Sequence, residues 1–260
     1  MIAEQVIDEL SKLNGVEAVA LGGSRASDNA DKKSDYDVYV YFSQIPGETE
    51  RKELLERYCS EYEIGNHYWE YEDNCVLNDG IPMDIIYRSL KDFSNEEQLH
   101  KFLLSAKNGY STCFLHNIIT CNIIYDKTGD FTKIQQNLMG KYSDSLRKEI
   151  IERNMKLLHG VLPSYDMQIK KAVIRGDLVS INHRTAGFME SYFDVIFALN
   201  KMTHPGEKKL IKICLEQCKI LPENFEENLN RLFTSMYSEY DFDALESIIS
   251  ELEKVVKDNL

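Results

Sequence analysis

One short pattern near the N-terminus constrains the fold more than any other part of the chain. Residues 35–42, DYDVYVYF, alternate in polarity, which predicts a β-strand with two different faces. Asp35 and Asp37 would share one face with Tyr39 and Tyr41, and the apolar residues between them would line the other. Two carboxylates on one face repel each other unless a proton or a cation lies between them. The pattern therefore indicates either an ionic site or an ordinary solvent-facing strand.

A glycine-rich turn precedes this strand and favours the ionic site. VEAVAL, residues 16–21, predicts a short buried strand, and Gly22, Gly23 and Ser24 follow it directly. Glycine lets the backbone approach a ligand closely, and backbone N–H groups with a serine hydroxyl bind phosphate oxygens. A plain tight turn is the alternative. Since Mg²⁺ takes one or two protein carboxylates and completes its shell with water and phosphate oxygens, turn and strand together predict a metal and phosphate site.

The pattern of the sequence changes near residue 93. Before it, predicted helices alternate with strands, among them IPMDIIYR at residues 81–88. After it, amphipathic helical patterns dominate, with one further strand in CNIIYDKTG. We expect an α+β protein: a domain with a mixed β-sheet flanked by helices over residues 1–135, followed by an all-α helical bundle over residues 136–260.

Composition and charge argue against several classes of function. The formal net charge is −13, which argues against nucleic acid as a partner, because nucleic-acid binders concentrate positive charge. The same charge would attract a cationic small molecule. Six cysteines occur without a CxxC pair, which argues against a zinc ribbon. We find no secretory signal and no apolar run long enough for a membrane span, so we expect a cytoplasmic protein without a membrane partner.

The combined motif resembles that of a known superfamily. Gly23-Ser24, ten further residues and Asp35-Tyr36-Asp37-Val38 resemble the signature of the nucleotidyltransferases that include DNA polymerase beta. GGSRA, SDYDVYVYF and a helical C-terminal part are more similar to the small-molecule branch, the aminoglycoside and lincosamide adenylyltransferases. The resemblance implies Mg²⁺-dependent transfer of a nucleoside monophosphate, AMP from ATP, to a hydroxyl of a small molecule such as an aminoglycoside-like antibiotic, with release of pyrophosphate.

Two other functions remain open at this point. One is transfer of the nucleotide to a protein, as in an antitoxin-like or regulatory enzyme. The other is a module that binds nucleotide without catalysis. The resemblance is compatible with a monomer or a homodimer, and the sequence does not decide which acceptor is used.

The resemblance also assigns roles to carboxylates. Asp35 and Asp37 would bind Mg²⁺, and Asp84, the acid within the predicted strand at residues 81–88, would complete the set of metal ligands. A carboxylate near the metal would act as the general base. Asp84 is one candidate; Glu70 is another, because related streptomycin-type adenylyltransferases use a glutamate in a comparable place. Trp69, which precedes it, is interpreted as a site neighbour or as a core residue.

The residues expected to bind the triphosphate come from two parts of the chain. The candidates in the turn are Gly22, Gly23, Ser24 and Arg25. In the helical part, Lys208 and Lys209 stand at the start of a predicted helix, where cations oppose the helix dipole unless an anion is near. Two solvated lysines are the alternative. Glu190 and Asp194, four residues apart on another predicted helix, are a candidate patch for a cationic substrate or else the polar face of a surface helix.

Overall fold

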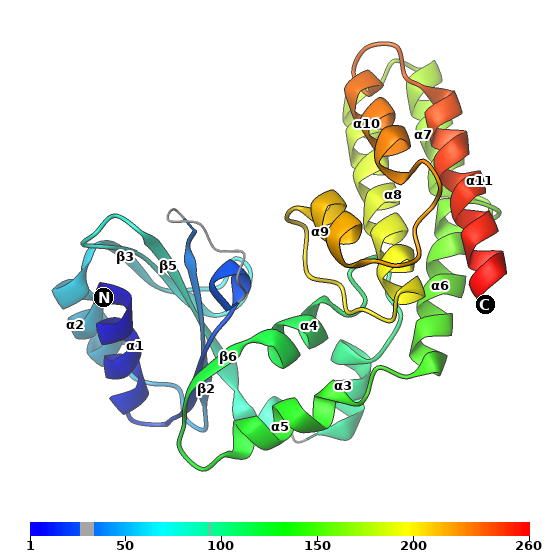
Figure 1. Ribbon diagram of the computed structural model, residues 1–260. Helices are drawn as coiled ribbons and strands as arrows, with labels where there is room; N and C mark the ends of the chain where they lie inside the picture. The colour runs from blue at the N-terminus through cyan, green and yellow to red at the C-terminus, as the bar shows by residue number, and fades with distance from the viewer. Residues whose placement is uncertain (27–33, 94) are drawn as a thin grey trace. The chain divides into compact units, whose positions relative to one another are not determined.

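The computed structural model describes residues 1–26, 34–93 and 95–260 of the 260-residue chain. The chain divides into two compact units (Figure 1). The N-terminal unit comprises residues 1–101 and 117–141, and the helical unit comprises residues 102–116 and 142–260. The expected α+β class, a mixed sheet with helices followed by a helical region, is confirmed. The expected single boundary after residue 135 does not describe residues 102–116, which pack with the later helices.

The N-terminal unit is built on a mixed six-stranded sheet in the order β3-β4-β5-β2-β1-β6. β2 and β5 are parallel, and the other neighbouring pairs are antiparallel. The strands are β1 (Val16–Leu21), β2 (Tyr36–Phe42), β3 (Cys59–Asn66), β4 (Glu72–Leu77), β5 (Pro82–Ser89) and β6 (Asn122–Asp126). The three strands expected at residues 16–21, 35–42 and 81–88 are present within one residue of their expected bounds.

Helices α1 (Ile2–Lys12) and α2 (Glu48–Tyr58) cover one face of this sheet (Figure 1). Val38 and Val40 of β2 are buried in the core that these helices form with the strands. The alternate residues of β2 lie on the opposite face, as the pattern predicts, and there the Tyr41 ring stacks on Phe131 at 3.8 Å between centroids. The other elements of the chain up to residue 141 are the 3₁₀ helices η1 (Gly23–Ala26) and η2 (Leu90–Phe93) and the helices α3 (Glu96–Leu103), α4 (Cys113–Thr120) and α5 (Asp130–Met139).

A buried ion pair fixes α2 to the sheet. Arg51 of α2 and Asp73 of β4 are both inaccessible to solvent and form a salt bridge. Tyr87 donates its hydroxyl to the second oxygen of Asp73 at 2.9 Å, and Arg51 donates to the Tyr71 hydroxyl at 2.6 Å. A buried charge pair is tolerated only when its remaining hydrogen-bonding groups are satisfied, and these tyrosines contribute to that.

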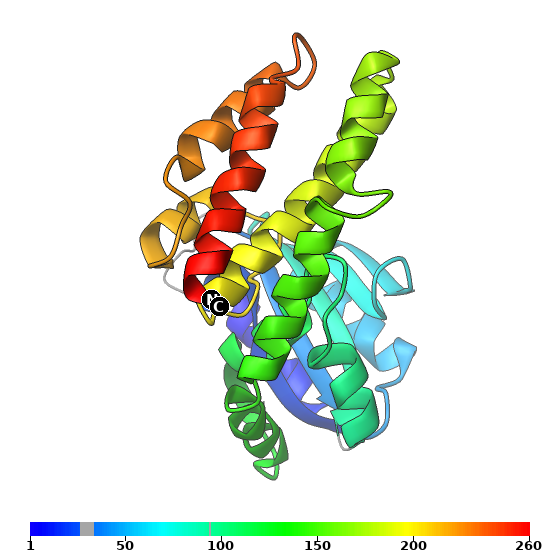
Figure 2. The same cartoon turned by 90° about the vertical axis from the view of Figure 1, so that its right-hand side faces the viewer.

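The helical unit is a bundle around α8. Its elements are α6 (Asp144–Leu158), α7 (Tyr165–Ile174), α8 (Leu178–Leu199), α9 (Leu210–Gln217), α10 (Phe225–Ser235) and α11 (Phe242–Asn259). α8 packs against α6 and α7 (Figure 2), and nearly all side chains of its second half are buried. Among the residues described, we find no helix with the length and apolarity that crossing a membrane requires.

Candidate active site

The two acids Asp37 and Asp84 are neighbours on the sheet. They are register partners on the parallel strands β2 and β5. Because adjacent strands lie about 4.8 Å apart and partners in register point to the same face, the two side chains stand side by side. This face is the one that α1 and α2 do not cover, and both side chains are only half-buried. The strand pairing thus brings together two acids that are far apart in the sequence.

The glycine turn lies directly against Asp37. The Gly22 N–H donates to the Asp37 carbonyl at 2.7 Å. Gly23 has a φ of 59°, and a Cβ at this position would lie 1.8 Å from Oδ2 of Asp37. A Cβ at Gly22 would lie 2.3 Å from the Tyr39 ring. Both glycines are therefore required by close contact with β2, and turn and acidic strand form one continuous site. The side chain of Ser24 lies outside the described part of the structure.

Arg25 is hydrogen-bonded to the backbone just before β2. The strand begins at Tyr36, so Asp35 lies one residue before it. Arg25 donates from Nε to the backbone carbonyls of Ser34 at 2.8 Å and of Asp35 at 3.1 Å, and its guanidinium lies 3.8 Å from the centre of the Tyr36 ring. Arg25 thus holds the backbone that carries Asp35. Its expected contact with a phosphate stays a prediction.

Strand β4 adds two polar residues that the sequence analysis missed. Asn74 is the register partner of Asp84 and donates to its Oδ1 at 2.7 Å. Glu72 lies two residues earlier on the same face and is 7% exposed. Burial, and then the charge of Asp84, raise the pKa of Glu72 above its ordinary value. Knowing that β4 pairs with β5 would have revealed both residues.

Glu70 is bound by an arginine. Arg88 donates from Nε to one carboxylate oxygen of Glu70 at 2.9 Å and from Nη2 to the other at 2.6 Å. The Arg88 guanidinium also lies 4.3 Å from the centre of the Tyr39 ring. Trp69 is 89% exposed, so its interpretation as a core residue is wrong.

The donor set suits Mg²⁺ held jointly with a substrate. In the part of the chain that the structure describes, no three His, Cys, Asp or Glu side chains gather closely enough to hold a metal. The expected set of Asp35, Asp37 and Asp84 is therefore not a preformed three-carboxylate cage. The adjacent pair Asp37 and Asp84 fits an ion that takes one or two protein carboxylates and fills its shell with phosphate oxygens and water.

The candidates on α8 have a structural role. Asp194 is 2% exposed and accepts hydrogen bonds from the Ser111 hydroxyl at 2.6 Å and from the Asn154 amide at 3.0 Å. Burial raises the pKa of Asp194 to about 6. The Cβ of Glu190 would lie 2.6 Å from a Cβ added at Gly109, so it packs against that backbone. Asp194 is therefore part of neither an acidic surface patch nor the polar face of a surface helix.

Lys208 and Lys209 are exposed residues directly before α9. Lys209 occupies the N-cap position with a φ of 59°. Both belong to the helical unit, whereas Asp37 and Asp84 belong to the N-terminal unit. Binding of the triphosphate by these lysines stays a prediction.

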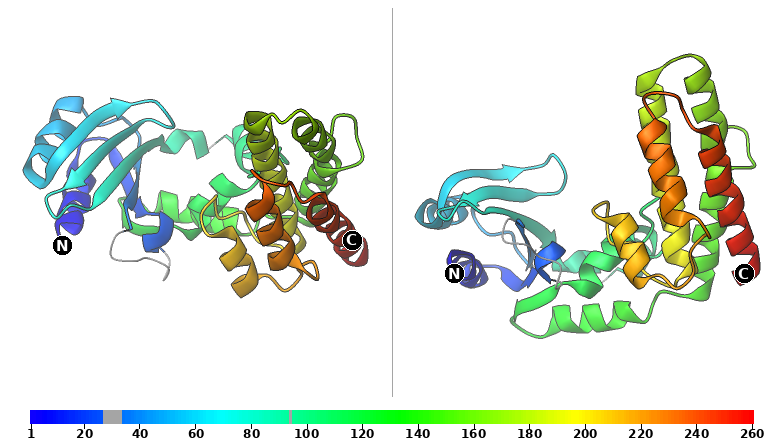
Figure 3. Two further views of the ribbon diagram at one scale, coloured as in Figure 1. Left: turned by 90° about the horizontal axis from the view of Figure 1, so that it is seen from above. Right: turned by 45° about the horizontal axis from the view of Figure 1, so that its top comes forward.

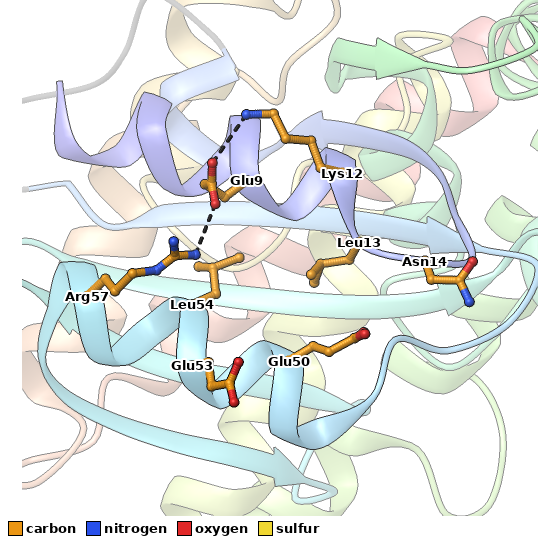
Figure 4. A pocket seen from close by; sticks show the side chains of 8 residues that line it. All are labelled: Glu9, Lys12, Leu13, Asn14, Glu50, Glu53, Leu54 and Arg57. Atoms are coloured by element: carbon orange, nitrogen blue, oxygen red, sulfur yellow. Dashed lines mark hydrogen bonds and ion pairs between the residues drawn. The ribbon is translucent and has the colours of Figure 1, made fainter.

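A hollow lies between α1 and α2 (Figure 4). Arg57 forms an ion pair with Glu9 at 2.9 Å, and Lys12 forms another with Glu9 at 3.2 Å. Because α1 and α2 cover the face of the sheet opposite Asp37, this hollow is separate from the candidate site.

Comparison with known proteins identifies the region that contains the site. Residues 3–107 match the family model of the nucleotidyltransferase domain, and residues 110–210 match a domain of unknown function, DUF4037. A search of curated proteins finds no match.

Several solved structures are similar to the chain. A nucleotidyltransferase-like protein from Exiguobacterium sibiricum has 10% identity and a TM-score of 0.42, with 99% of this chain and 74% of that one covered. An aminoglycoside 6-adenyltransferase from Bacillus subtilis has 10% identity and a TM-score of 0.31, with coverage of 98% and 87%. The CCA-adding enzyme of Thermotoga maritima has 11% identity and a TM-score of 0.29, with coverage of 98% and 80%.

The family model matches the part of the chain with the glycine turn, the acidic strand and Asp84. The chain is therefore an enzyme with a nucleotidyltransferase domain in residues 3–107.

Proposed function

We propose that the protein transfers AMP from ATP to a hydroxyl group of a small molecule and releases pyrophosphate, with Mg²⁺ as cofactor. One observation carries this proposal: Asp37 lies against the backbone of Gly23 on one side and beside Asp84 on the other. The turn proposed to hold the phosphates and the two carboxylates proposed to bind the metal are thus adjacent. The reaction needs this arrangement, because the metal must contact the triphosphate while the turn holds it.

The residues of the site have two proposed roles, phosphate binding and metal binding. The backbone of Gly22 and Gly23, with the Ser24 hydroxyl and Arg25, would hold the β- and γ-phosphates. Asp37 and Asp84, with Asp35 at the edge, would hold Mg²⁺, which when bound supplies positive charge to the triphosphate. Asn74 fixes the orientation of the Asp84 carboxylate by its hydrogen bond.

The transfer itself is a single in-line displacement. The acceptor oxygen forms a bond to the α-phosphorus, the bond from that phosphorus to the bridging oxygen breaks, and pyrophosphate leaves. A carboxylate takes the proton of the acceptor hydroxyl. We assign this step to Asp84 over Glu70, because Glu70 is held by Arg88 at both oxygens. Lys208 and Lys209 are proposed as further contacts to the triphosphate.

The acceptor is proposed to be a cation, such as an aminoglycoside. The net charge of −13 favours positive ligands and argues against nucleic acid as acceptor. The carboxylate of Glu72 lies on the same side of the sheet as Asp84 and adds to this field, whereas Glu70 is paired with Arg88.

The test is a transfer assay with an acceptor panel. The purified protein is incubated with Mg²⁺, with each of the four nucleoside triphosphates labelled at the α-phosphate, and with aminoglycosides, lincosamides, tRNA and lysate fractions. We expect a labelled small-molecule adduct and an equal amount of pyrophosphate with wild type and with the exposed control Glu53→Gln, and none with Asp37→Asn. The absence of any adduct, or an adduct that Asp37→Asn still forms, would overturn the proposal.

A further inference from the structure

The loop between β3 and β4, residues 67–71, carries two large exposed aromatic side chains. Tyr68 is 80% exposed and Trp69, the only tryptophan of the chain, is 89% exposed. The loop forms the tip of the β3–β4 hairpin, drawn in cyan in Figure 3. Aromatic side chains contribute strongly to binding, and two adjacent solvent-exposed aromatic side chains indicate a surface that binds a ligand or another molecule.

Two buried arginines hold this loop from opposite faces of the sheet. On the face of the candidate site, Arg88 binds both carboxylate oxygens of Glu70. On the other face, Arg51 donates to the hydroxyl of Tyr71, the next residue, at 2.6 Å. The His67 ring lies 4.6 Å from the Tyr71 ring. Because the base of the loop is fixed on both sides, the aromatic tip is presented in a defined position, which lowers the entropic cost of binding.

Side-chain contacts connect the loop to the glycine turn at Gly22. Arg88 stacks over Tyr39, and the Tyr39 ring fills the space next to Gly22. Arg88 follows Asp84 by four residues on β5, which corresponds to about 13 Å along a strand. A small molecule can span that distance, which separates Asp84 from the base of the loop at Arg88.

The charges around the loop favour a cation. Glu72 lies on the same face as Asp84, and the neutral amide of Asn74 on the same strand donates a hydrogen bond to Asp84. Arg88 balances Glu70, but the buried carboxylate of Glu72 adds further negative charge next to the loop. Negative groups attract a cation and repel a triphosphate. The faces of Trp and Tyr rings also attract cations. Aromatic and acidic side chains together therefore suit a cationic acceptor better than the nucleotide.

We propose that Tyr68 and Trp69 form the binding platform for the acceptor, that this acceptor is a cationic ring compound, and that Arg88 positions the platform through Glu70. The proposal rests on the proposed transfer reaction and names the substrate class and the residues that select it. Trp69 acts as a specificity residue and takes no part in the bond changes.

A fluorescence experiment tests the platform without an identified acceptor. Since Trp69 is the only tryptophan, its emission reports on this loop alone. The probes are N-methylpyridinium, a cationic ring, and acrylamide, a neutral molecule, at low ionic strength. Normalised to free N-acetyltryptophanamide, N-methylpyridinium should quench Trp69 about threefold more strongly than acrylamide. The double variant with Glu70→Gln and Glu72→Gln should lose the preference for the cationic probe. The control double variant with Glu50→Gln and Glu53→Gln, on α2, should keep it. Equal quenching by both probes, or a preference that both double variants retain, would overturn the proposal.

Kinetics with the acceptor found in the transfer assay form the second arm. Trp69→Ala should raise the KM for the acceptor about tenfold and leave the KM for ATP unchanged. Arg88→Ala should raise the same KM, and Arg88→Lys should restore it in part because lysine keeps the charge but not the paired contact. Tyr237→Ala, an exposed tyrosine of the helical unit, is the control. A higher KM for ATP instead would contradict the acceptor assignment. If the wild-type protein transfers no nucleotide, the proposed function is wrong. The fluorescence experiment still tests separately whether Tyr68 and Trp69 bind a cationic ring.

Discussion

Asp84 of β5 is the register partner of Asp37 on the parallel strand β2, and Asn74 of β4 donates a hydrogen bond to Asp84 from the other side. We expect Asp84→Asn to lower the rate of transfer by a factor of about 10³ or more, since a metal ligand and the proton acceptor are lost together. Asn74→Ala should lower it by about tenfold through lost orientation. Steady-state rates at saturating substrates measure both effects. Asp79→Asn, in the exposed turn between β4 and β5, should leave the rate unchanged; a loss there equal to that of Asp84→Asn would contradict the assignment.

Gly23→Ala tests the contact between turn and strand. A methyl group at this position would meet the Asp37 carboxylate at 1.8 Å, and the φ of 59° adds strain. Transfer should fall by about 10²-fold or more because the phosphate seat and Asp37 cannot keep their places. Gly80→Ala is the matched control, with a φ of 83° and no atom within 4 Å of the added Cβ. Gly80→Ala should lower the free energy of unfolding by about 1 kcal/mol and leave the activity normal. Equal activity in the two variants would show that the contact between Gly23 and Asp37 does not matter for transfer.

Arg51→Met tests the buried ion pair that fixes α2 and the base of the aromatic loop. The change leaves Asp73 charged and buried without its partner, so the free energy of unfolding should fall by about 3–5 kcal/mol. Lys52→Met removes the neighbouring exposed pair with Glu56, whose atoms are 3.8 Å apart, and should cost less than about 0.5 kcal/mol. Urea denaturation measures both values. Similar losses in the two variants would contradict the structural role of Arg51.

Asp194 predicts a pH dependence of stability. Its pKa of about 6 in the folded protein exceeds the value of about 3.9 in an unfolded chain. Between these values the folded state binds a proton that the unfolded state has lost, so the free energy of unfolding decreases as the pH rises through this window. Relative to Asp194→Asn, wild type should lose about 2–3 kcal/mol between pH 4 and pH 7. Urea denaturation at several pH values measures the difference, and a constant difference would show that Asp194 has an ordinary pKa.

The central part of the site could be predicted from the sequence because its signals are local. The alternation in β2 and the glycines before it lie within one short stretch, and their chemistry follows from residue type. Asp84 could be proposed because it interrupts an apolar strand. That Asp37 and Asp84 are register partners could not be predicted, because register depends on strand pairing across the sheet.

Strands β3 and β4, at one edge of the sheet, could not be predicted from the sequence for a physical reason. β3 is an edge strand with mostly exposed residues, so it lacks the apolar alternation that identifies a strand. β4 carries Glu72, Asp73 and Asn74, whose polarity suits the candidate site on one face and Arg51 on the other. The same limit applies to Asp194: its helical spacing suggested a surface, whereas the segment at residues 102–116 covers it and supplies Ser111.

The most direct test of the central claim is the binding of ATP measured by isothermal titration calorimetry with and without Mg²⁺. If Asp37 and Asp84 hold a metal that contacts the triphosphate, wild type should bind ATP at least about tenfold more tightly with Mg²⁺ than with EDTA. The double variant Asp37→Asn, Asp84→Asn should lose this difference, whereas Glu53→Gln should keep it. Binding of ATP that is independent of Mg²⁺ in wild type, or a Mg²⁺ effect that survives in the double variant, would contradict the account.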